Sequence, residues 1–323
     1  MWPKIGPLRG RVFSRAVLAG LTAALLVLPA AALAASSSGS ANAALPASLA
    51  HRSLSFGDAL AARGRLTASD AGREVVLELA PARHAWQAVA RARVAADGAY
   101  ELRAVARVSG RVRVRLEPLS QDQAVGAPPP AARTSRPQDV AVAARLTTRP
   151  RRLQLLSGRA VRVSGVLLPR RAGRTVRLEG RVAGRWRTLA SARTSTRGHF
   201  GVRLLARGLG TSPLRVRFAG DPANSASQRA AGRLEVFRVS SASWYQLTGY
   251  RLGCGGRMGA DQLGVANKTL PCGTLVTFRY GSRSVRVPVI DRGPYVGGRE
   301  WDLSGATKRA LGFPGLGQVW SSR

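Results

Sequence analysis

Short runs that alternate between apolar and polar residues fill the middle of the chain. Examples are "REVVLEL", "GAYELRAV" and "RVRVRL", followed further on by "RTVRLEG" and "PLRVRFAG". Turn-forming stretches such as "DAG", "ADG", "RAG" and "TRG" separate these runs. Alternation with a period of two, bounded by Gly and Asp, is typical of antiparallel strands with one buried face. We therefore predict an all-β structure for this part of the chain.

The two alternating regions are copies of one another, offset by about 100 residues. The landmarks that correspond are Gly64 and Gly165, Gly72 and Gly173, Glu78 and Glu179, Trp86 and Trp186, Gly98 and Gly198, and Tyr100 and Phe200. A duplicated unit built of many short strands predicts two tandem β-sandwiches. The end of the second copy, "VRFAGDPANSASQRAAGRLEVF", resembles the closing strands of bacterial Ig-like repeats. We expect Ig-like modules at 51–149 and 150–239, with the single Trp of each copy in its core.

The N-terminal region has the order of segments found in a secretory signal peptide. Basic residues precede an apolar run from Ala16 to about Leu33, and a small-residue A-L-A site ends at Ala34. This order predicts a signal peptide at 1–35 and a Ser/Ala-rich linker at 36–50. An uncleaved membrane anchor is the alternative, since the apolar run could almost span a bilayer. We expect a secreted, cell-wall-associated protein that meets the membrane only transiently, through the signal peptide.

The chain of 323 residues carries a formal net charge of +35, nearly all of it from arginine. Dense positive charge binds phosphate whatever the sequence. The arginines are spread evenly through an Ala/Gly/Val-rich background, however, so we expect no nucleic-acid partner. The charge favours retention at an anionic surface.

Two cysteines, Cys254 and Cys272, lie within the last third of the chain. In an exported protein, an isolated pair within one module is most simply a disulfide, which would stabilise that module by about 3 kcal/mol. A metal pair or a thiol catalyst is disfavoured because the three histidines, His51, His84 and His199, all lie outside this region. We expect no metal and no cofactor.

From Ser240 onwards the composition changes, and a set of ordered motifs begins. They are "ASWY" at 242–245, "KTLPCGT" at 268–274, "VRVPVIDRGP" ending at Pro294, and "GREWDLS" at 298–304. This set resembles the double-psi β-barrel domain of the rare lipoprotein A family. The resemblance implies a six-stranded double-psi β-barrel at 240–323 and lytic transglycosylase activity on peptidoglycan glycan strands. The same barrel occurs in expansins, which loosen wall polysaccharide without cutting it, so function depends on the site.

Asp291 is the predicted proton-transfer group. Lytic transglycosylase chemistry needs one carboxyl group that protonates the glycosidic oxygen and then accepts a proton from the sugar's 6-hydroxyl. In "SVRVPVID", the residues Val285, Val287 and Val289 form one apolar strand face, which Asp291 continues to the strand end. Partial burial there favours a protonated carboxyl group, and Arg292 is expected to point away. Alternatively, Asp291 holds the "DRGPYVGG" turn through backbone amides.

Asp302 is the predicted partner of Asp291. It precedes "SGATKRALG", a short helix that Ser304 could cap and Gly312 could end. The positive end of this helix is expected to keep Asp302 ionised. The alternative is that Asp302 itself caps the helix.

The expected family pattern is incomplete in this chain. Counting back from Lys268, the positions of the family's His and two acidic groups are occupied by Asn267, Gly259 and Gly256. Asp261 lies two residues from Gly259 and could substitute only if the loop is rebuilt. Cutting and non-catalytic, expansin-like binding or loosening of wall glycan therefore both stay open.

Sugar contacts are expected from aromatic side chains and from the motifs that carry the resemblance. Aromatic faces offer apolar area to sugar rings. Of the neighbours Trp244 and Tyr245, we expect Tyr245 to face the substrate and Trp244 to be the core residue. The predicted substrate-binding residues are Tyr245, Lys268, Thr269, Arg292, Tyr295 and Trp301. The expected partner is peptidoglycan or another wall polysaccharide.

Overall fold

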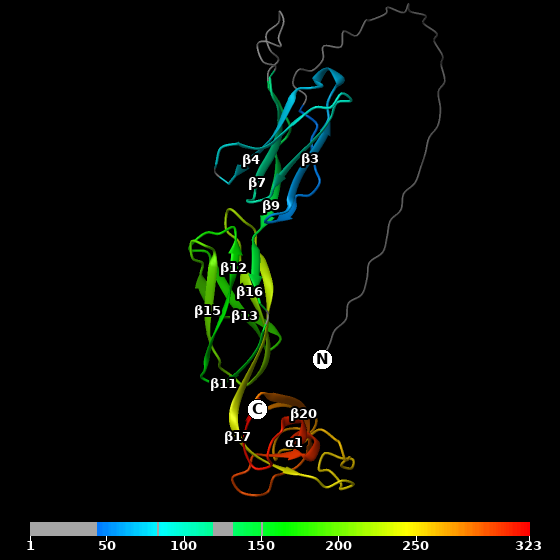
Figure 1. The fold of residues 1–323 in the computed structure, drawn as a ribbon, viewed down its shortest axis with the longest axis vertical. Coiled ribbons are helices and arrows are strands. Elements are labelled where there is room, and N and C mark those ends of the chain that lie inside the picture. The colour runs from blue at the N-terminus through cyan, green and yellow to red at the C-terminus, as the bar shows by residue number, and fades with distance from the viewer. Residues whose placement is uncertain (1–43, 83, 119–131, 150) are drawn as a thin grey trace, which may run out of the picture. The chain divides into compact units, whose positions relative to one another are not determined.

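The computed structural model describes residues 44–82, 84–118, 132–149 and 151–323 (Figure 1). The predicted signal peptide at 1–35 lies outside the described residues. Within them the fold is all-β, as predicted: apart from the strands there is one α-helix, α1 (Gly305–Leu311), and one 3-10 turn at Ala68–Asp70. No helix in these ranges is long and apolar enough to cross a membrane.

The first module consists of two sheets around one core. One sheet has the order β1-β3-β6, from β1 (Ser48–Leu49), β3 (Ala59–Arg65) and β6 (Ala99–Val105). The other has the order β2-β9-β7-β4-β5, with β8 paired to β7. Its strands are β2 (Ser53–Ser55), β9 (Gln138–Ala143), β7 (Gly110–Leu116), β4 (Glu74–Pro81), β5 (Gln87–Arg93) and β8 (Arg133–Thr134). Alternate residues of both sheets, such as Leu102 and Val114, are fully buried against one another.

The second module repeats this arrangement. Its smaller sheet has the order β10-β12-β15, from β10 (Arg145–Thr148), β12 (Ala160–Leu168) and β15 (His199–Leu205). The larger one has the order β14-β13-β16-β17, with β11 paired in parallel to β17. Its strands are β14 (Arg185–Arg193), β13 (Thr175–Val182), β16 (Gly210–Phe218), β17 (Ser227–Tyr245) and β11 (Arg151–Leu156). Both modules shift register at equivalent points, at Leu77/Glu78 and at Leu178/Glu179, which supports the duplication read from the sequence.

Module boundaries differ from those predicted. Leu45 lies in the predicted linker, yet it is buried in the first core and is followed by β1. Strand β10 precedes the predicted boundary at residue 150, but it pairs with β12 and contributes Leu146 to the second core. Strand β17 crosses the predicted boundary at residue 240 without a break. Sheet pairing thus sets these boundaries, and local composition does not reveal it.

The duplicated tryptophans are not core residues, which corrects the prediction. Trp186 is 38% exposed, and the guanidinium of Arg215 stacks 4.2 Å from its ring centroid. Trp86 is half-buried under Arg113, 4.3 Å from its ring centroid. A guanidinium covers an aromatic face well, so each ring is shielded on the outside of its sheet.

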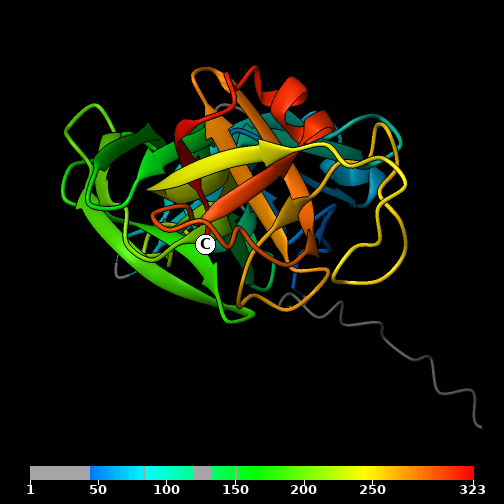
Figure 2. The ribbon, with the colours of Figure 1, turned by 90° about the horizontal axis from the view of Figure 1, so that it is seen from below.

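Strand β17 continues from the second module into the third, where the pairing follows the order β17-β21-β18-β20-β19-β22. Strand β22 pairs with β19 and also with β17, so this path returns to its first strand. The added strands are β18 (Val265–Ala266), β19 (Leu275–Tyr280), β20 (Arg283–Asp291), β21 (Trp301–Ser304) and β22 (Gly317–Ser321). Figure 2 shows these orange and red strands together with α1. Their inward side chains, Val276, Phe278, Val287 and Leu303 among them, form a separate core.

Helix α1 begins and ends where the sequence predicts. The Ser304 hydroxyl accepts a hydrogen bond from the Thr307 backbone N–H, and Gly312 ends the helix with a φ of 64°. Only a residue that tolerates the left-handed region fits this position easily. The helix therefore follows directly after β21 and fixes the end of the strand that carries Asp302.

Candidate functional site

Asp291 of β20 and Asp302 of β21 lie on the two strands that flank β18, on either side of Ala266. Ala266 of β18 is the register partner of Asp291 in β20 and of Asp302 in β21. The register of β18 and β20 shifts between Val265 and Ala266, so that Asp291 rather than Ile290 stands opposite Ala266. Local irregularities of this kind re-aim side chains near functional sites. The fold thus brings two carboxyl groups, eleven residues apart in sequence, to one row across the sheet.

Asp302 is a half-buried carboxyl group without an ion pair among the described residues. Its Oδ1 accepts a hydrogen bond of 2.8 Å from the Ser243 hydroxyl. Burial raises the pKa of Asp302. The hydrogen bond from Ser243 and the charge of Arg299 partly oppose this rise, and the charge of Asp291 adds the smallest contribution, which is upward. The alternative in which Asp302 caps the helix is wrong, because Ser304 caps α1. The position before the helix suggested a low pKa for Asp302, whereas burial raises that pKa.

Asp291 is anchored by the backbone of two chain segments. Its Oδ1 accepts hydrogen bonds from the backbone N–H of Gly253, at 2.7 Å, and of Arg292, at 2.8 Å. A side chain at position 253 would collide with Asp291 and Arg292, so glycine lets this loop approach the carboxylate. The bond to Arg292 agrees with the alternative that Asp291 holds its own turn. The bond to Gly253 shows that it also fixes a distant loop.

Tyr245 lies beside both carboxyl groups. Its hydroxyl oxygen is buried, and no partner among the described residues meets hydrogen-bond geometry. Burial raises the pKa of Tyr245, and the nearby negative charges of Asp291 and Asp302 raise it further. A hydrogen bond to Asp291 contributes to the same rise, so the Tyr245 hydroxyl lies against this carboxyl group even though the contact misses strict geometry.

The loop after β18 binds the Arg292 guanidinium. Arg292 Nη1 donates to the carbonyls of Asn267, at 3.0 Å, and Leu270, at 2.9 Å, and Arg292 Nη2 donates to Cys272 Sγ at 2.9 Å. Asn267 is buried, and its side-chain oxygen accepts the N–H groups of Thr269 and Leu270. Arg292 therefore points away from Asp291, as predicted, but it supports this loop and does not present itself to substrate.

The predicted disulfide is present. Cys254 and Cys272 are joined, and the bond connects the loop that contacts Asp291 with the loop held by Arg292. Lys268 and Thr269 stand exposed on the second of these loops. Tyr295 is 82% exposed, so its ring is open to a sugar face.

Three aromatic or acidic assignments need correction. Trp301, predicted to bind substrate, is only 1% exposed and packs edge-on against Phe278, 5.1 Å between ring centroids. Trp244, predicted as a core residue, is 42% exposed and lies 4.0 Å below Lys308 Nζ. Asp261 does not join the carboxyl pair, because it forms an exposed ion pair with Arg309.

Two residues of the site escaped the sequence interpretation. Ser243 bonds to Asp302, and Gly253 bonds to Asp291. Ser243 could have been found, since it stands two residues before Tyr245 in a strand and so projects to the same side. Gly253 carries no such signal. No group of three His, Cys, Asp or Glu side chains that could hold a metal occurs in the described ranges.

The third module is similar in sequence to domains of known proteins. Residues 238–320 match a protein family described as "Lytic transglycolase". A protein of Synechocystis sp. named "Probable endolytic peptidoglycan transglycosylase RlpA" is 40% identical over 96 residues, covering 28% of this chain and 30% of that protein. A protein of the same name from Aquifex aeolicus is 41% identical over 76 residues, covering 22% and 34%. The matches thus span about a third of these curated relatives, and the chain carries an RlpA-like domain at its C-terminal end.

Proposed function

We propose that this protein is an exported cell-envelope protein whose third module cuts peptidoglycan glycan strands as a lytic transglycosylase. The carrying observation is the pair of carboxyl groups, Asp291 and Asp302, that faces Ala266 from both sides without an arginine partner in the described chain. The similarity of residues 238–320 to lytic transglycosylases supports the reaction class. On this proposal, two Ig-like sandwiches precede a six-stranded double-psi barrel, and the sequence at 1–35 directs export.

The reaction needs one carboxyl group that first donates a proton and then accepts one. A protonated carboxyl group gives its proton to the glycosidic oxygen as the bond from that oxygen to C1 breaks. The resulting carboxylate then accepts the proton of the sugar's 6-hydroxyl while O6 bonds to C1 and closes a 1,6-anhydro ring. No water molecule is consumed, so a second carboxylate to activate water is not required.

Asp302 is the carboxyl group of this pair whose protonated form is favoured by its surroundings. Burial raises its pKa, and the charge of Asp291 makes a smaller contribution in the same direction. The sequence favoured Asp291 as the donor with Asp302 as its ionised partner. The raised pKa of Asp302 makes this residue a second candidate for the donor, beside Asp291. Tyr245 supports the pair from below through its buried hydroxyl, and Tyr295 offers an exposed ring to the sugar.

A second function, non-catalytic binding or loosening of wall glycan in the manner of expansins, is favoured by one observation. Asn267 occupies the position of the family's His, but it is buried, and within the described residues its side chain bonds only to its own loop and to the Glu300 carbonyl. Gly256 and Gly259 supply no side chain at the two acidic positions. A site with a single acidic pair could hold glycan without cutting it.

Mass spectrometry of digested glycan separates these functions. The full chain is incubated with glycan strands freed of their stem peptides, and the products are searched for 1,6-anhydro ends. We expect such ends, together with co-sedimentation of the protein with intact sacculi. Co-sedimentation without anhydro ends would contradict the enzymatic function and support non-catalytic binding. If neither is observed, peptidoglycan is not the partner.

A further inference from the structure

The outer face of the larger sheet in the second module carries three arginines on adjacent strands. Arg177 of β13 is the register partner of Arg217 in β16. Arg193 of β14 is the register partner of Thr175 and so stands diagonal to Arg177 across the same two strands. Side chains that are directly opposite in a sheet begin about 5 Å apart, and diagonal ones about 7 Å apart. We call Arg177, Arg193 and Arg217 the arginine cluster.

Alternation along each strand places the arginine cluster on one side of the sheet. The residues directly before or after its members, Val176, Ala192 and Phe218, pack in the core of the second module. Successive side chains of a strand point to opposite faces, so the three guanidinium groups share the outer face. Two of the three arginines are exposed and the third is half-buried.

Neighbouring acidic residues compensate little of the positive charge of the arginine cluster. Within the described residues, its one ion pair joins Arg217 to Glu179, at 3.7 Å. Glu179 lies closer to Arg215, at 2.7 Å, so this carboxylate is shared with an arginine outside the cluster. Like charges that face each other across strands repel. An anion bound between them would replace this repulsion by attraction.

The first module has two carboxylates at the equivalent place. Glu74 and Glu117 form ion pairs there with Arg91 and Arg115. Strand register gives the correspondence between the copies: Glu74 with Thr175, Val76 with Arg177, Arg91 with Ser191, Arg93 with Arg193, Arg115 with Arg217, and Glu117 with Ala219. Each copy therefore has three arginines at these positions, but the second copy lacks both carboxylates.

Polar residues adjoin the arginine cluster on the outer face. Its cross-strand partners outside the cluster are Ser191, Thr175 and Gln228. None of these three side chains is an apolar group that could insert into a membrane. Their hydroxyl and amide groups can instead donate further hydrogen bonds to an anion. This surface therefore suits a hydrated, charged polymer better than a lipid bilayer.

We propose that the arginine cluster binds the phosphate groups of a linear, non-peptide polymer. Guanidinium groups recognise phosphate through paired, charge-assisted hydrogen bonds. Adjacent strands lie about 4.8 Å apart, so the cluster offers a row of guanidinium groups that successive phosphates of one chain can occupy. This binding would hold the protein at a phosphate-rich surface independently of the third module and its acidic pair.

The sharpest test gives the second module the carboxylates of the first. Thr175→Glu combined with Ala219→Glu introduces them at two exposed positions. The full chain is titrated with linear inorganic polyphosphate by calorimetry, at about 0.15 M salt. We expect the double Glu variant to bind about tenfold more weakly, the usual effect of losing one charge-assisted hydrogen bond. Thr175→Gln combined with Ala219→Gln controls for size and should change binding less than about twofold.

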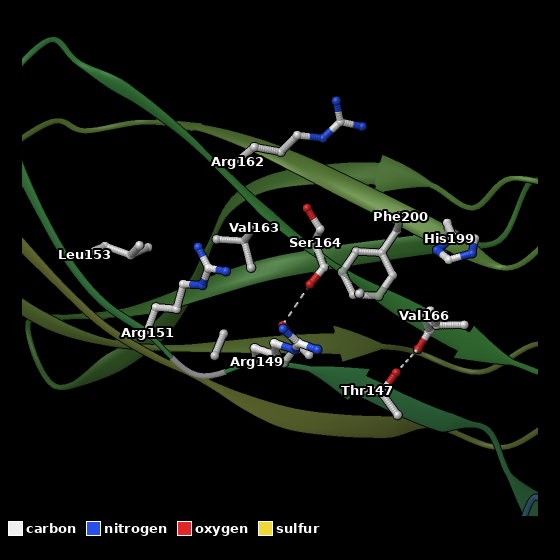
Figure 3. Close-up of a pocket in the computed structure, with 13 residues that line it drawn as sticks. Thr147, Arg149, Arg151, Leu153, Arg162, Val163, Ser164, Val166, His199 and Phe200 are labelled. Atoms are coloured by element: carbon white, nitrogen blue, oxygen red, sulfur yellow. Dashed lines mark hydrogen bonds between the residues drawn. The ribbon is translucent and has the colours of Figure 1, made fainter.

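Arg162→Glu is the control for net charge, because it makes the same total change in charge on the other sheet. Arg162 projects from β12 away from the core residues Val163 and Phe200 (Figure 3), and Arg203 is its register partner in β15. The two sheets lie about 10 Å apart and charges at that distance are screened at this salt, so we expect a loss below about threefold. Equal losses in Arg162→Glu and in the double Glu variant would overturn the proposal, because binding would then follow net charge alone.

Two further titrations use the same variants, and thermal unfolding checks that each variant is folded. The double Glu variant should unfold at no lower temperature than the unmodified protein, because its carboxylates relieve repulsion between arginines. If poly-L-glutamate binds as tightly as polyphosphate and shows the same losses, the site takes acidic peptides and the phosphate assignment is wrong. If phosphatidylglycerol vesicles bind with these losses and polyphosphate does not bind, the partner is a membrane and the polymer assignment is wrong.

Discussion

Glu78 and Glu179 occupy equivalent positions in the two sandwich modules, and each is buried next to arginine. Glu78 bonds to Arg113 and Arg115, which together outweigh burial and lower its pKa. Glu179 bonds to Arg215 at 2.7 Å. In the third module, Asp291 and Asp302 have no ion pair among the described residues, in a chain with 51 basic residues. Burial raises the pKa of Asp302 there.

The difference separates carboxylates that hold structure from carboxyl groups that can exchange a proton. Arginine next to a buried carboxylate fixes its charge and removes it from acid–base chemistry at neutral pH. In the third module the guanidinium of Arg292, which follows Asp291 in the chain, is bound to loop carbonyls and to the disulfide. The loop therefore protects the acidic pair from neutralisation, and substitutions in the three modules can test this difference.

The largest expected effect is on cutting. Asp291→Asn and Asp302→Asn should each reduce formation of 1,6-anhydro ends by about 100-fold or more, the usual contribution of an acid–base group. Glu179→Gln should leave the rate unchanged, because its carboxylate is neutralised far from the site. Rates are measured by mass spectrometry on peptide-free glycan strands. An Asp291→Asn variant that cuts normally would show that Asp302 acts alone.

The second-largest effect is expected from removal of the disulfide. Replacing both Cys254 and Cys272 by Ser is expected to lower the free energy of unfolding by about 3 kcal/mol. It should also release the loop that holds Arg292, and the pH optimum of cutting should move to lower pH as the guanidinium approaches Asp291. Urea denaturation and a pH–rate profile measure the two effects. An unchanged pH profile would show that the disulfide does not keep the Arg292 guanidinium away from Asp291.

A smaller loss is expected where arginines are left without their carboxylate. Glu179→Gln should destabilise the protein by about 2 kcal/mol, because Glu179 is buried and its arginine partners are only partly exposed. Glu101→Gln is the matched control, since Glu101 is half-exposed, and its change should stay within about 0.5 kcal/mol. Both free energies of unfolding are measured by urea denaturation. Equal losses in Glu179→Gln and Glu101→Gln would show that the buried ion pair of Glu179 stabilises the protein no more than the exposed pair of Glu101.

The smallest expected effect is a pH-dependent change in the stability of Asp302→Asn, and its sign tests whether folding raises the pKa of Asp302. A carboxyl group whose pKa is raised by folding destabilises the folded state as the pH rises from the unfolded value of about 4 through the raised one. Asp302→Asn removes this penalty, so the variant should gain stability relative to the unmodified protein between about pH 4 and pH 7. Urea denaturation at both pH values measures it. A relative loss on going to neutral pH would mean that Asp302 is ionised and stabilising, as first expected from its place before α1.

Local features of the third module could be predicted because neighbouring residues determine them. The cap at Ser304, the end of α1 at Gly312 and the strand that ends at Asp291 follow from short-range sequence patterns. The tryptophans could not be assigned in this way. Whether Trp301 or Trp244 is buried depends on which strands and side chains pack over each ring, such as Phe278 and Lys308, and these come from distant parts of the chain.

The all-β class, the duplicated unit, the RlpA-like C-terminal module and the cysteine pair could all be predicted from the sequence, because alternation and ordered motifs are properties of neighbouring residues. Tertiary structure decided which charges are neutralised. The register shift at Ala266 brings Asp291 into the same row as Asp302, with Ala266 between them, and the loop carbonyls bind Arg292 away from Asp291. Each depends on strands paired across long sequence separations, where a shift of one residue changes which charges meet.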